Sequence, residues 1–196
     1  SRVGDKIQSK LVAHKAGVGT VPGVDEAIKS EKDAIAFARS CGYPVMLKAS
    51  AGGGGRGMRI VREEKDLLAE FNNAQSEARK AFGIDDIFIE KYIENPKHIE
   101  VQVLGDEYGN LVHLYERDCS VQRRHQKVIE FTPSQILTQA QREAICEDAL
   151  KIAREVNYKS AGTVEFLLDN DGNHYFIEMN TRIQVEHTVT EMVIRG

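Results

Sequence analysis

The spacing of apolar residues along the chain changes several times, and each spacing predicts a particular kind of element. Between residues 64 and 81, apolar side chains recur every three or four positions, including Leu67, Phe71, Ala74 and Ala78. This spacing places them on one side of an amphipathic helix. The same spacing, together with cap residues and glycine stops, predicts helices over residues 5–16, 30–42 and 138–156.

From Ile87 onward the spacing of apolar residues changes to two. Ile99, Val101 and Val103 alternate with polar residues, which predicts a half-buried strand. Further strands are expected over residues 44–49, 58–61, 111–116, 162–169 and 174–180, the last two as a hairpin. These elements predict an α+β fold with two lobes. The small lobe would cover residues 1–88, with an entry helix and a glycine-rich loop, and the larger lobe residues 89–196, on an antiparallel sheet.

Composition narrows the classes of function. The 196 residues are 41% hydrophobic, and 26 basic against 30 acidic residues leave a net charge of −4. This balance argues against a chain-wide basic surface for nucleic acid. Apolar runs of a few residues fall far short of the roughly 20 needed to span a membrane, and the first residues show no secretory signal. Three cysteines without paired spacing indicate reduced thiols. We therefore expect a cytoplasmic protein that binds neither nucleic acid nor membrane.

A run of glycines at residues 52–57 lies between two predicted strands. Glycine lets a backbone approach a ligand closely and present several N–H donors, which suits phosphate. Gly52, Gly54 and Gly57 satisfy the dinucleotide-binding spacing, but that motif requires a helix after the loop, and Met58 begins a predicted strand. A Walker A loop requires a lysine after the last glycine, and none follows here. In protein kinases the glycine-rich loop precedes the strand lysine, whereas in this sequence Lys48 comes before the glycine run. The run is therefore interpreted as a flap over phosphates, or else as a long flexible hairpin.

Two acidic residues face each other in the predicted hairpin if its loop has four residues. Asp169 then pairs with His174, Glu165 lies opposite Glu178, and Asn180 follows on the same face. Two carboxylates and an amide oxygen form a set of hard oxygen ligands that suits Mg²⁺ or Mn²⁺ bridged to nucleotide phosphates. A loop of three or five residues would break this register. The alternative is a solvated polar face.

Residues 117–127 are polar and cationic between two predicted strands, which indicates either a local anion site or a solvated loop. A second polar motif follows the acidic hairpin closely. Alternation places Arg182, Gln184 and Glu186 on one face, where the first two could hold a small oxyanion and Glu186 could act as a general base. His187 points the other way in this pattern and is interpreted as structural.

Five segments carry the most specific motifs. They read KASAGGGGRGMR from Lys48, EKYIENP from Glu90, ERDCS from Glu116, QRRHQK from Gln122 and EMNTRIQVEH from Glu178. Together they resemble the ATP-grasp core of biotin carboxylases, and the likeness covers nearly the whole chain. The segments GDEYGN and HTVTE resemble bacterial pyruvate carboxylases most, with the biotin carboxylase component of acyl-CoA carboxylases close behind. The resemblance implies an ATP-grasp fold, in which two α+β lobes with antiparallel sheets grip a nucleotide.

The resemblance also implies a role for each matched residue. Residues expected to contact ATP, with the three glycines as a lid, are Lys6, Lys48, Gly53, Gly54, Gly55, Met58, Glu90, Lys91, Ile93, His98, Gln122, His125 and Leu167. Glu165 and Glu178 are expected to hold Mg²⁺ or Mn²⁺, with Asn180 nearby. The residues expected to bind bicarbonate are Lys127, Arg182, Gln184 and Val185. Glu186 would deprotonate the bicarbonate.

The implied reaction begins with attack of bicarbonate on the γ-phosphate of ATP, which gives carboxyphosphate. Loss of phosphate then yields CO₂, which carboxylates biotin on a carrier domain. In the family a nucleotide-fold domain precedes this segment, and more of the catalytic lobe, with a further arginine of the site, follows it. We therefore expect an excised core of a pyruvate carboxylase-type enzyme that works with flanking domains. The alternatives are another ATP-grasp ligase, such as a carbamoyl-phosphate synthetase, and a nucleotide-binding module without turnover.

Overall fold

The computed structural model describes residues 2–50, 57–123 and 126–194, with side chains from residue 8 onward. The chain divides into two compact units, of which the smaller is Val21–Ile93 and the larger is the remainder. This division differs from the boundary expected after residue 88. The first helix belongs to the larger unit because Ala13 and Val18 are buried in that unit's core. The chain leaves the smaller unit only after Ile93.

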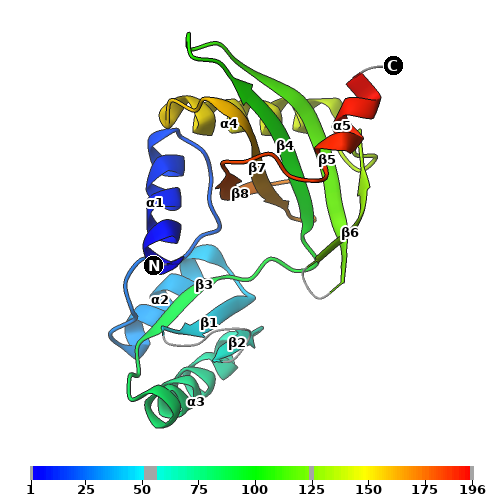
Figure 1. Ribbon diagram of the computed structural model, residues 1–196. Helices are drawn as coiled ribbons and strands as arrows, with labels where there is room; N and C mark the ends of the chain where they lie inside the picture. Colours follow the sequence, from blue (N-terminus) through cyan, green and yellow to red (C-terminus); the bar gives the residue numbers. More distant parts are fainter. Residues whose placement is uncertain (1, 51–56, 124–125, 195–196) are drawn as a thin grey trace. The chain divides into compact units, whose positions relative to one another are not determined.

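The smaller unit is a three-stranded antiparallel sheet with two helices packed against it (Figure 1). Its strands run in the order β2 (Met58–Val61), β1 (Val45–Ala49) and β3 (Ile87–Lys91). The helices are α2 (Glu31–Cys41) and α3 (Glu64–Phe82), which confirms both helices predicted in this region. Ser30 caps α2 by accepting the Asp33 N–H at 3.2 Å. Gly83 ends α3 with a left-handed φ of 72°.

Alternation along β1 separates the two faces of the small sheet. Val45, Leu47 and Ala49 are buried with the apolar residues of α2 and α3. Lys48 lies on the opposite face, because successive side chains of a strand point to opposite sides. The core of this unit therefore positions Lys48 away from the helices.

The larger unit is a five-stranded antiparallel sheet in the order β6–β5–β4–β7–β8 (Figure 1). In chain order its strands are β4 (Lys97–Gly105), β5 (Leu111–Arg123), β6 (Gln126–Phe131), β7 (Ser160–Leu168) and β8 (His174–Asn180). Its helices are α1 (Arg2–Lys15), α4 (Gln139–Glu155) and α5 (His187–Ile194). A reciprocal capping box between Thr138 and Gln141 begins α4 at the place that the sequence predicted.

The two faces of β4 are both buried. Ile99, Val101 and Val103 pack with apolar residues of α4, as their spacing predicted. Glu100 and Gln102 on the other face are only 1% and 4% exposed, so the prediction of a half-buried strand was wrong. Those polar residues are covered because they lie among charged groups from other elements, described below.

The cysteines are all free thiols, and two of them, Cys119 and Cys146, are buried. Burial raises the pKa of the Cys146 thiol to about 12. Among the helices that the structure describes, none combines the length and apolar character that crossing a bilayer requires.

Candidate active site

The acidic hairpin pairs β7 with β8 and contains the one carboxylate pair that the sequence predicted. Glu165 lies opposite Glu178, which confirms the predicted pairing. The loop, however, has five residues instead of four, because His174 pairs with Leu168 and not with Asp169. A shift in the ladder at Ile177 compensates for the longer loop, since Phe166 pairs with Phe176 and Glu165 with Glu178. A β-bulge thus restores the pairing that a five-residue loop would otherwise break.

The carboxylates of this hairpin fit a divalent cation. The Asn180 side chain donates from Nδ2 to Glu165 Oε1 at 2.8 Å, which places its amide beside the carboxylate pair. Over the described part of the chain, no group of three or more His, Cys, Asp or Glu side chains is arranged to hold a metal. The hairpin thus gathers two carboxylates and one side-chain amide, whose nitrogen contacts Glu165. Mg²⁺ at nucleotide sites is commonly held by one or two carboxylates, with waters and phosphate oxygens completing its shell.

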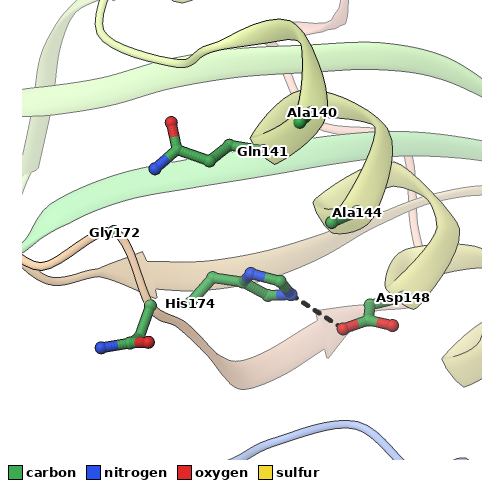
Figure 2. Close-up of a pocket in the computed structure, with 7 residues that line it drawn as sticks. Ala140, Gln141, Ala144, Asp148, Gly172 and His174 are labelled. Carbon is green, nitrogen blue, oxygen red and sulfur yellow. Dashed lines mark hydrogen bonds and ion pairs between the residues drawn. The ribbon is translucent and has the colours of Figure 1, made fainter.

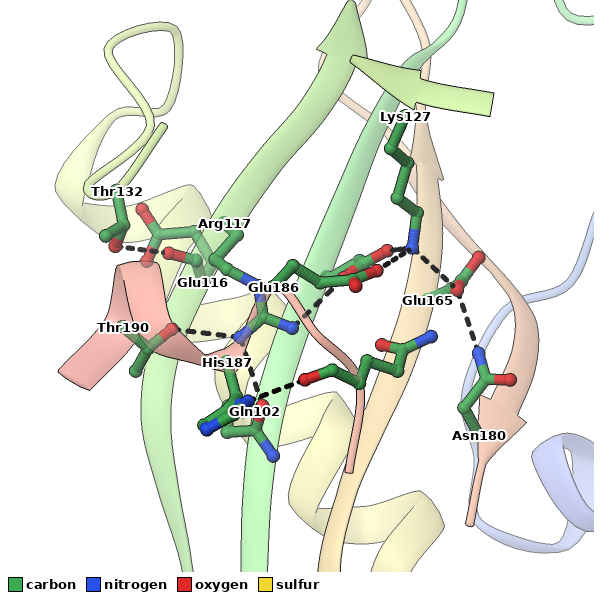
Figure 3. Close-up of polar contacts among 12 residues, drawn as sticks. Gln102, Glu116, Arg117, Lys127, Thr132, Glu165, Asn180, Glu186, His187 and Thr190 are labelled. Atoms are coloured by element: carbon green, nitrogen blue, oxygen red, sulfur yellow. Dashed lines mark hydrogen bonds and ion pairs between the residues drawn. The ribbon is translucent and has the colours of Figure 1, made fainter. Parts of the chain in front are cut away.

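Lys127 connects the hairpin to the last motif (Figure 3). Its ammonium lies 3.3 Å from Glu165 Oε1 and 3.1 Å from Glu186 Oε1, and it also contacts Glu100. These residues come from β4, β6, β7 and the turn before α5. Lys127 is 20% exposed, so its charge is screened less by solvent than that of a surface lysine. One cation therefore holds a proposed metal ligand and a proposed base together.

The charges around Glu186 favour its ionised form. Burial by itself raises the pKa of Glu186, but hydrogen bonds from the backbone and from Lys127 outweigh it. The positive charges of Lys127 and Arg117 add to them, so the pKa of Glu186 is below its usual value. Burial and the nearby charge of Glu186 raise the pKa of Glu130. Glu186 is thus a carboxylate at neutral pH and can accept a proton.

The segment before α5 does not alternate as the sequence predicted. Residues 181–186 are not a strand, so Arg182, Gln184 and Glu186 do not share one extended face. Arg182 is exposed, and Gln184 is 6% exposed. Val185, matched to a bicarbonate contact, is 86% exposed. The His187 ring lies at the start of α5, with its Nδ1 2.7 Å from the Gln184 carbonyl oxygen. Its structural role stays a prediction.

The basic stretch is strand, not loop. Most of residues 117–127 belongs to β5 and β6, because β5 continues to Arg123, well beyond the predicted end at residue 116. Gln122 pairs with Lys127 across these strands. In the neighbouring ladder His98 pairs with Leu167, on the same face as Glu165. The structure therefore brings His98 and Leu167 to the face that carries the acidic hairpin.

The matched residues of the smaller unit divide between the two faces of its sheet. Lys48 forms an ion pair with Glu90, and Met58 pairs with Lys48 across β1 and β2, so all three share one face. Lys91 lies on the other face, where its ammonium donates to the carbonyl oxygens of Gly42 at 3.1 Å and Tyr43 at 2.9 Å. Ile93, which follows β3, is 8% exposed. The side chains of Lys48, Met58 and Glu90 are thus grouped, and that of Lys91 is not among them.

Five matched positions lie outside the part that the structure describes in full. They are the side chain of Lys6 and all of Gly53, Gly54, Gly55 and His125. The interpretation of the glycine run as a flap therefore stays a prediction.

Sequence reasoning missed the buried residues that support Lys127. Glu100 contacts its ammonium, and Arg117 contacts Glu100 in turn. The sequence signal for these residues was the polar series His98, Glu100 and Gln102, which alternates with the apolar residues of β4. We interpreted this series as the solvent-facing side of a half-buried strand. Polar residues at regular spacing do not reveal that charged partners from distant strands will cover them.

A separate pocket lies beside the hairpin turn, and none of the predicted site residues lines it. Figure 2 shows the His174 ring directed toward Asp148 on α4, with the Nε2 atom 2.8 Å from Oδ2. Lys151 also donates to Asp148, at 2.7 Å. These contacts anchor the start of β8 to α4. They stabilise the hairpin at a place outside the candidate site.

Comparison with known proteins identifies the class. Residues 5–195 match the family described as the carbamoyl-phosphate synthase L chain, ATP binding domain, and the chain belongs to this family. Its two units with antiparallel sheets form the ATP-grasp fold that the sequence predicted.

Within this class the similarity is to biotin carboxylases. The chain is 60% identical over 191 residues to the 2-oxoglutarate carboxylase small subunit of Hydrogenobacter thermophilus, and the match covers 97% of this chain and 40% of that protein. It is 56% identical over 190 residues to the pyruvate carboxylase of Staphylococcus aureus, covering 97% of this chain and 16% of that protein. The biotin carboxylase domain of a thermophilic 2-oxoglutarate carboxylase bound to ADP superposes with a TM-score of 0.88 at 60% identity. That match covers 97% of this chain and 42% of the other. The chain thus spans less than half of these relatives, and the resemblance to biotin carboxylases is confirmed.

Proposed function

We propose that the chain is the ATP-grasp core of an enzyme that carboxylates biotin with ATP and bicarbonate. The observation that carries this proposal is the position of Lys127 between Glu165 and Glu186, at 3.3 and 3.1 Å. An ammonium at this position can stabilise negative charge that develops on bicarbonate, and Glu186 beside it can accept the bicarbonate proton. The identity to biotin carboxylases over nearly the whole chain supports the same conclusion.

The chemistry follows from the charges at this position. Bicarbonate would bind Lys127 together with Arg182 and the nearby Gln184 and Val185. Glu186, ionised at neutral pH, would take the bicarbonate proton. The resulting dianion attacks the γ-phosphorus of ATP, so ADP leaves and carboxyphosphate forms. Carboxyphosphate breaks down to CO₂ and phosphate. The released phosphate takes the N–H proton of a ureido nitrogen of biotin, and that nitrogen forms a bond to the carbon of CO₂. Positive groups beside the reacting oxygens stabilise the charge that develops.

A divalent cation would be held by Glu165 and Glu178, with Asn180 completing the protein ligands. When bound, Mg²⁺ or Mn²⁺ would neutralise phosphate charge and orient the γ-phosphate. The chain's contribution is the register of the hairpin, because the bulge at Ile177 keeps Glu178 opposite Glu165. Asn180 fixes the Glu165 carboxylate by its 2.8 Å hydrogen bond.

The nucleotide roles implied by the matched motifs are part of the same proposal. ATP would contact Lys48, Met58 and Glu90 on one face of the small sheet, and His98, Gln122 and Leu167 in the larger unit. The remaining proposed contacts are Lys6, the glycines 53–55, Lys91, Ile93 and His125.

The proposed partners are bicarbonate, a biotinylated carrier domain and the flanking domains of a longer pyruvate carboxylase-type polypeptide. The relatives are more than twice as long as the chain, which supports flanking domains. We propose a cytoplasmic location, because all three cysteines are free.

The metal assignment is tested by calorimetry of ATP binding with and without Mg²⁺. We expect Mg²⁺ to strengthen binding to the wild-type chain and to have no effect on the double variant Glu165→Gln/Glu178→Gln. Glu147→Gln on the exposed side of α4 serves as the matched control. Equal Mg²⁺ dependence in the wild type and the double variant would remove these carboxylates from the metal site.

The reaction is tested by following ADP release from the full-length polypeptide. Release that requires bicarbonate and increases with free biotin is the expected result. Release that requires ammonia instead would favour the carbamoyl-phosphate synthetase alternative. Binding of ATP without any bicarbonate-dependent release would favour a nucleotide-binding module.

A further inference from the structure

Arg117 is a fully buried arginine on the polar face of the large sheet. It lies in the middle of β5, opposite Glu100 of β4, and is 0% exposed. Its guanidinium donates to Glu100 Oε2 at 3.1 Å, to Gln102 Oε1 at 3.0 Å and to Thr190 Oγ1 at 2.9 Å (Figure 3). Taking a guanidinium out of water is costly, and the cost is offset only when the geometry of its hydrogen bonds is good.

The carboxylate of Glu100 lies between Arg117 and Lys127 and contacts both side chains. One oxygen of Glu100 accepts from Arg117, and the other contacts the Lys127 ammonium. Glu100 is 1% exposed, so it cannot swing into solvent. Because Lys127 also contacts Glu186 and Glu165, the position of Arg117 determines where three charged side chains of the candidate site lie.

The hydroxyl of Thr190 connects Arg117 to Glu186 by a second route. Thr190 is 3% exposed and lies in the first turns of α5, four residues after Glu186. The turn between them is tight, since the Val189 N–H donates to the Glu186 carbonyl oxygen at 3.2 Å. The hydrogen bond from Arg117 to Thr190 therefore fixes the start of α5, and this in turn fixes the backbone of Glu186.

The backbone of β5 is shaped so that Arg117 points to this face. The ladder between β4 and β5 shifts opposite Gln102, and Tyr115 at that point has a left-handed φ of 60°. A bulge changes which face the following residues occupy. Downstream of it Glu116 faces α4, where it accepts from Arg142, and Arg117 faces the charged cluster. A strained backbone beside a site is commonly retained because it places a functional side chain.

We propose that Arg117 is a positioning residue that sets Lys127 and Glu186 for bicarbonate activation, without touching the substrates. This inference rests on the proposed function. Three acceptors surround the two terminal nitrogens of the Arg117 guanidinium, and a lysine ammonium cannot reach all three in the same fixed geometry. Arg117 therefore acts through geometry as well as charge.

The test uses the full-length polypeptide with Arg117→Lys, Thr190→Val and the control Arg154→Lys, whose arginine is exposed on α4. Arg117→Lys is expected to lower kcat for bicarbonate-dependent ATP cleavage on the order of 10–100-fold, as seen when groups that orient a site's ligands are removed. Thr190→Val removes only the hydrogen bond that Arg117 donates to α5, and it should lower kcat by roughly threefold or more. The KM for ATP should stay within about twofold in both variants, because neither residue is placed at the nucleotide.

Each outcome decides the inference. A wild-type kcat in either variant overturns it, and so does a KM for ATP that rises as kcat falls, because that pattern indicates general loosening. If Arg117→Lys does not fold, the isosteric Thr190→Val decides alone. Absence of bicarbonate-dependent cleavage in the wild type overturns the proposed function and the inference with it. Cleavage in the wild type with unchanged variants overturns only the role of Arg117.

Discussion

Glu116 provides a stringent test of the packing between β5 and α4. Its side chain is 0% exposed, and Oε1 accepts from Arg142 Nε at 2.8 Å and from the Ser134 N–H at 3.0 Å. Arg142 also donates to the Ser134 carbonyl oxygen at 3.0 Å. The arginine therefore neutralises a buried carboxylate and ties residue 134 to α4. We predict that Arg142→Leu, which keeps apolar volume and removes the charge, strongly destabilises the chain.

The magnitude follows from the burial of the carboxylate. Removing one partner of a buried ion pair costs about 3–5 kcal/mol, because the remaining charge is left without compensation. Arg142 is 17% exposed, so solvent replaces little of its contribution. Adding Glu116→Gln removes the stranded charge and leaves only lost hydrogen bonds, each about 0.5–1.5 kcal/mol. The double variant should therefore be more stable than Arg142→Leu by about 2 kcal/mol.

Urea unfolding followed by circular dichroism measures these differences. With a slope of about 1–3 kcal/mol per molar urea, the loss of about 3–5 kcal/mol in Arg142→Leu should lower the midpoint by roughly 1–5 M. Arg154→Leu on the exposed side of α4 is the control and should change stability by less than about 1 kcal/mol. If Arg142→Leu matches this control, or if adding Glu116→Gln brings no recovery, the assigned ion pair is wrong.

Three further predictions test other parts of the structure. Burial alone raises the pKa of Asp148, but hydrogen bonds from its neighbours leave it lowered. Asp148→Asn should therefore be less stable than the wild type at pH 7, and urea unfolding should show the difference shrink progressively as pH falls below about 4 and through the lowered pKa of Asp148. Thr138→Ala removes the capping box of α4 and should cost about 0.5–2 kcal/mol in the same assay. A thiol reagent should modify Cys41 first, because Cys119 and Cys146 are buried; equal rates for all three would contradict the described core.

The helices α1 to α4 were predictable because local spacing and cap residues record them, whereas α5 was not predicted. The face formed by Leu67, Phe71, Ala74 and Ala78 is continuous, so the predicted helix over residues 64–81 differs from α3 by one residue. Caps are equally local, and Ser30 begins α2 where the sequence placed it.

The hairpin shows why a correct pairing can rest on an incorrect loop. Counting back from a four-residue loop gave the pair Glu165 and Glu178, and the structure has this pair with a five-residue loop. The extra residue in the loop is balanced by the bulge at Ile177. A bulge depends on how two strands pack, so the residues around Ile177 carry no local signal for it.

The charged cluster could be predicted only in part. Glu186 and Lys127 were assigned from a motif, but Arg117 and Glu100 were not, because their partners lie far apart in the chain. Arg117 and Thr190 are 73 residues apart and meet only when α5 packs against β5. A buried ionic network is a property of the folded sheet, and alternation along one strand cannot separate it from a solvated edge.

The most direct test of the account compares bicarbonate-dependent ATP cleavage by the wild-type full-length polypeptide and by Glu186→Gln. Loss of the base should lower kcat by about 10²–10⁴-fold, while calorimetry shows nearly unchanged ATP binding. Glu155→Gln, an exposed glutamate at the end of α4, should behave as the wild type. Undiminished cleavage by Glu186→Gln would contradict the account, because the proton of bicarbonate would then leave by another route.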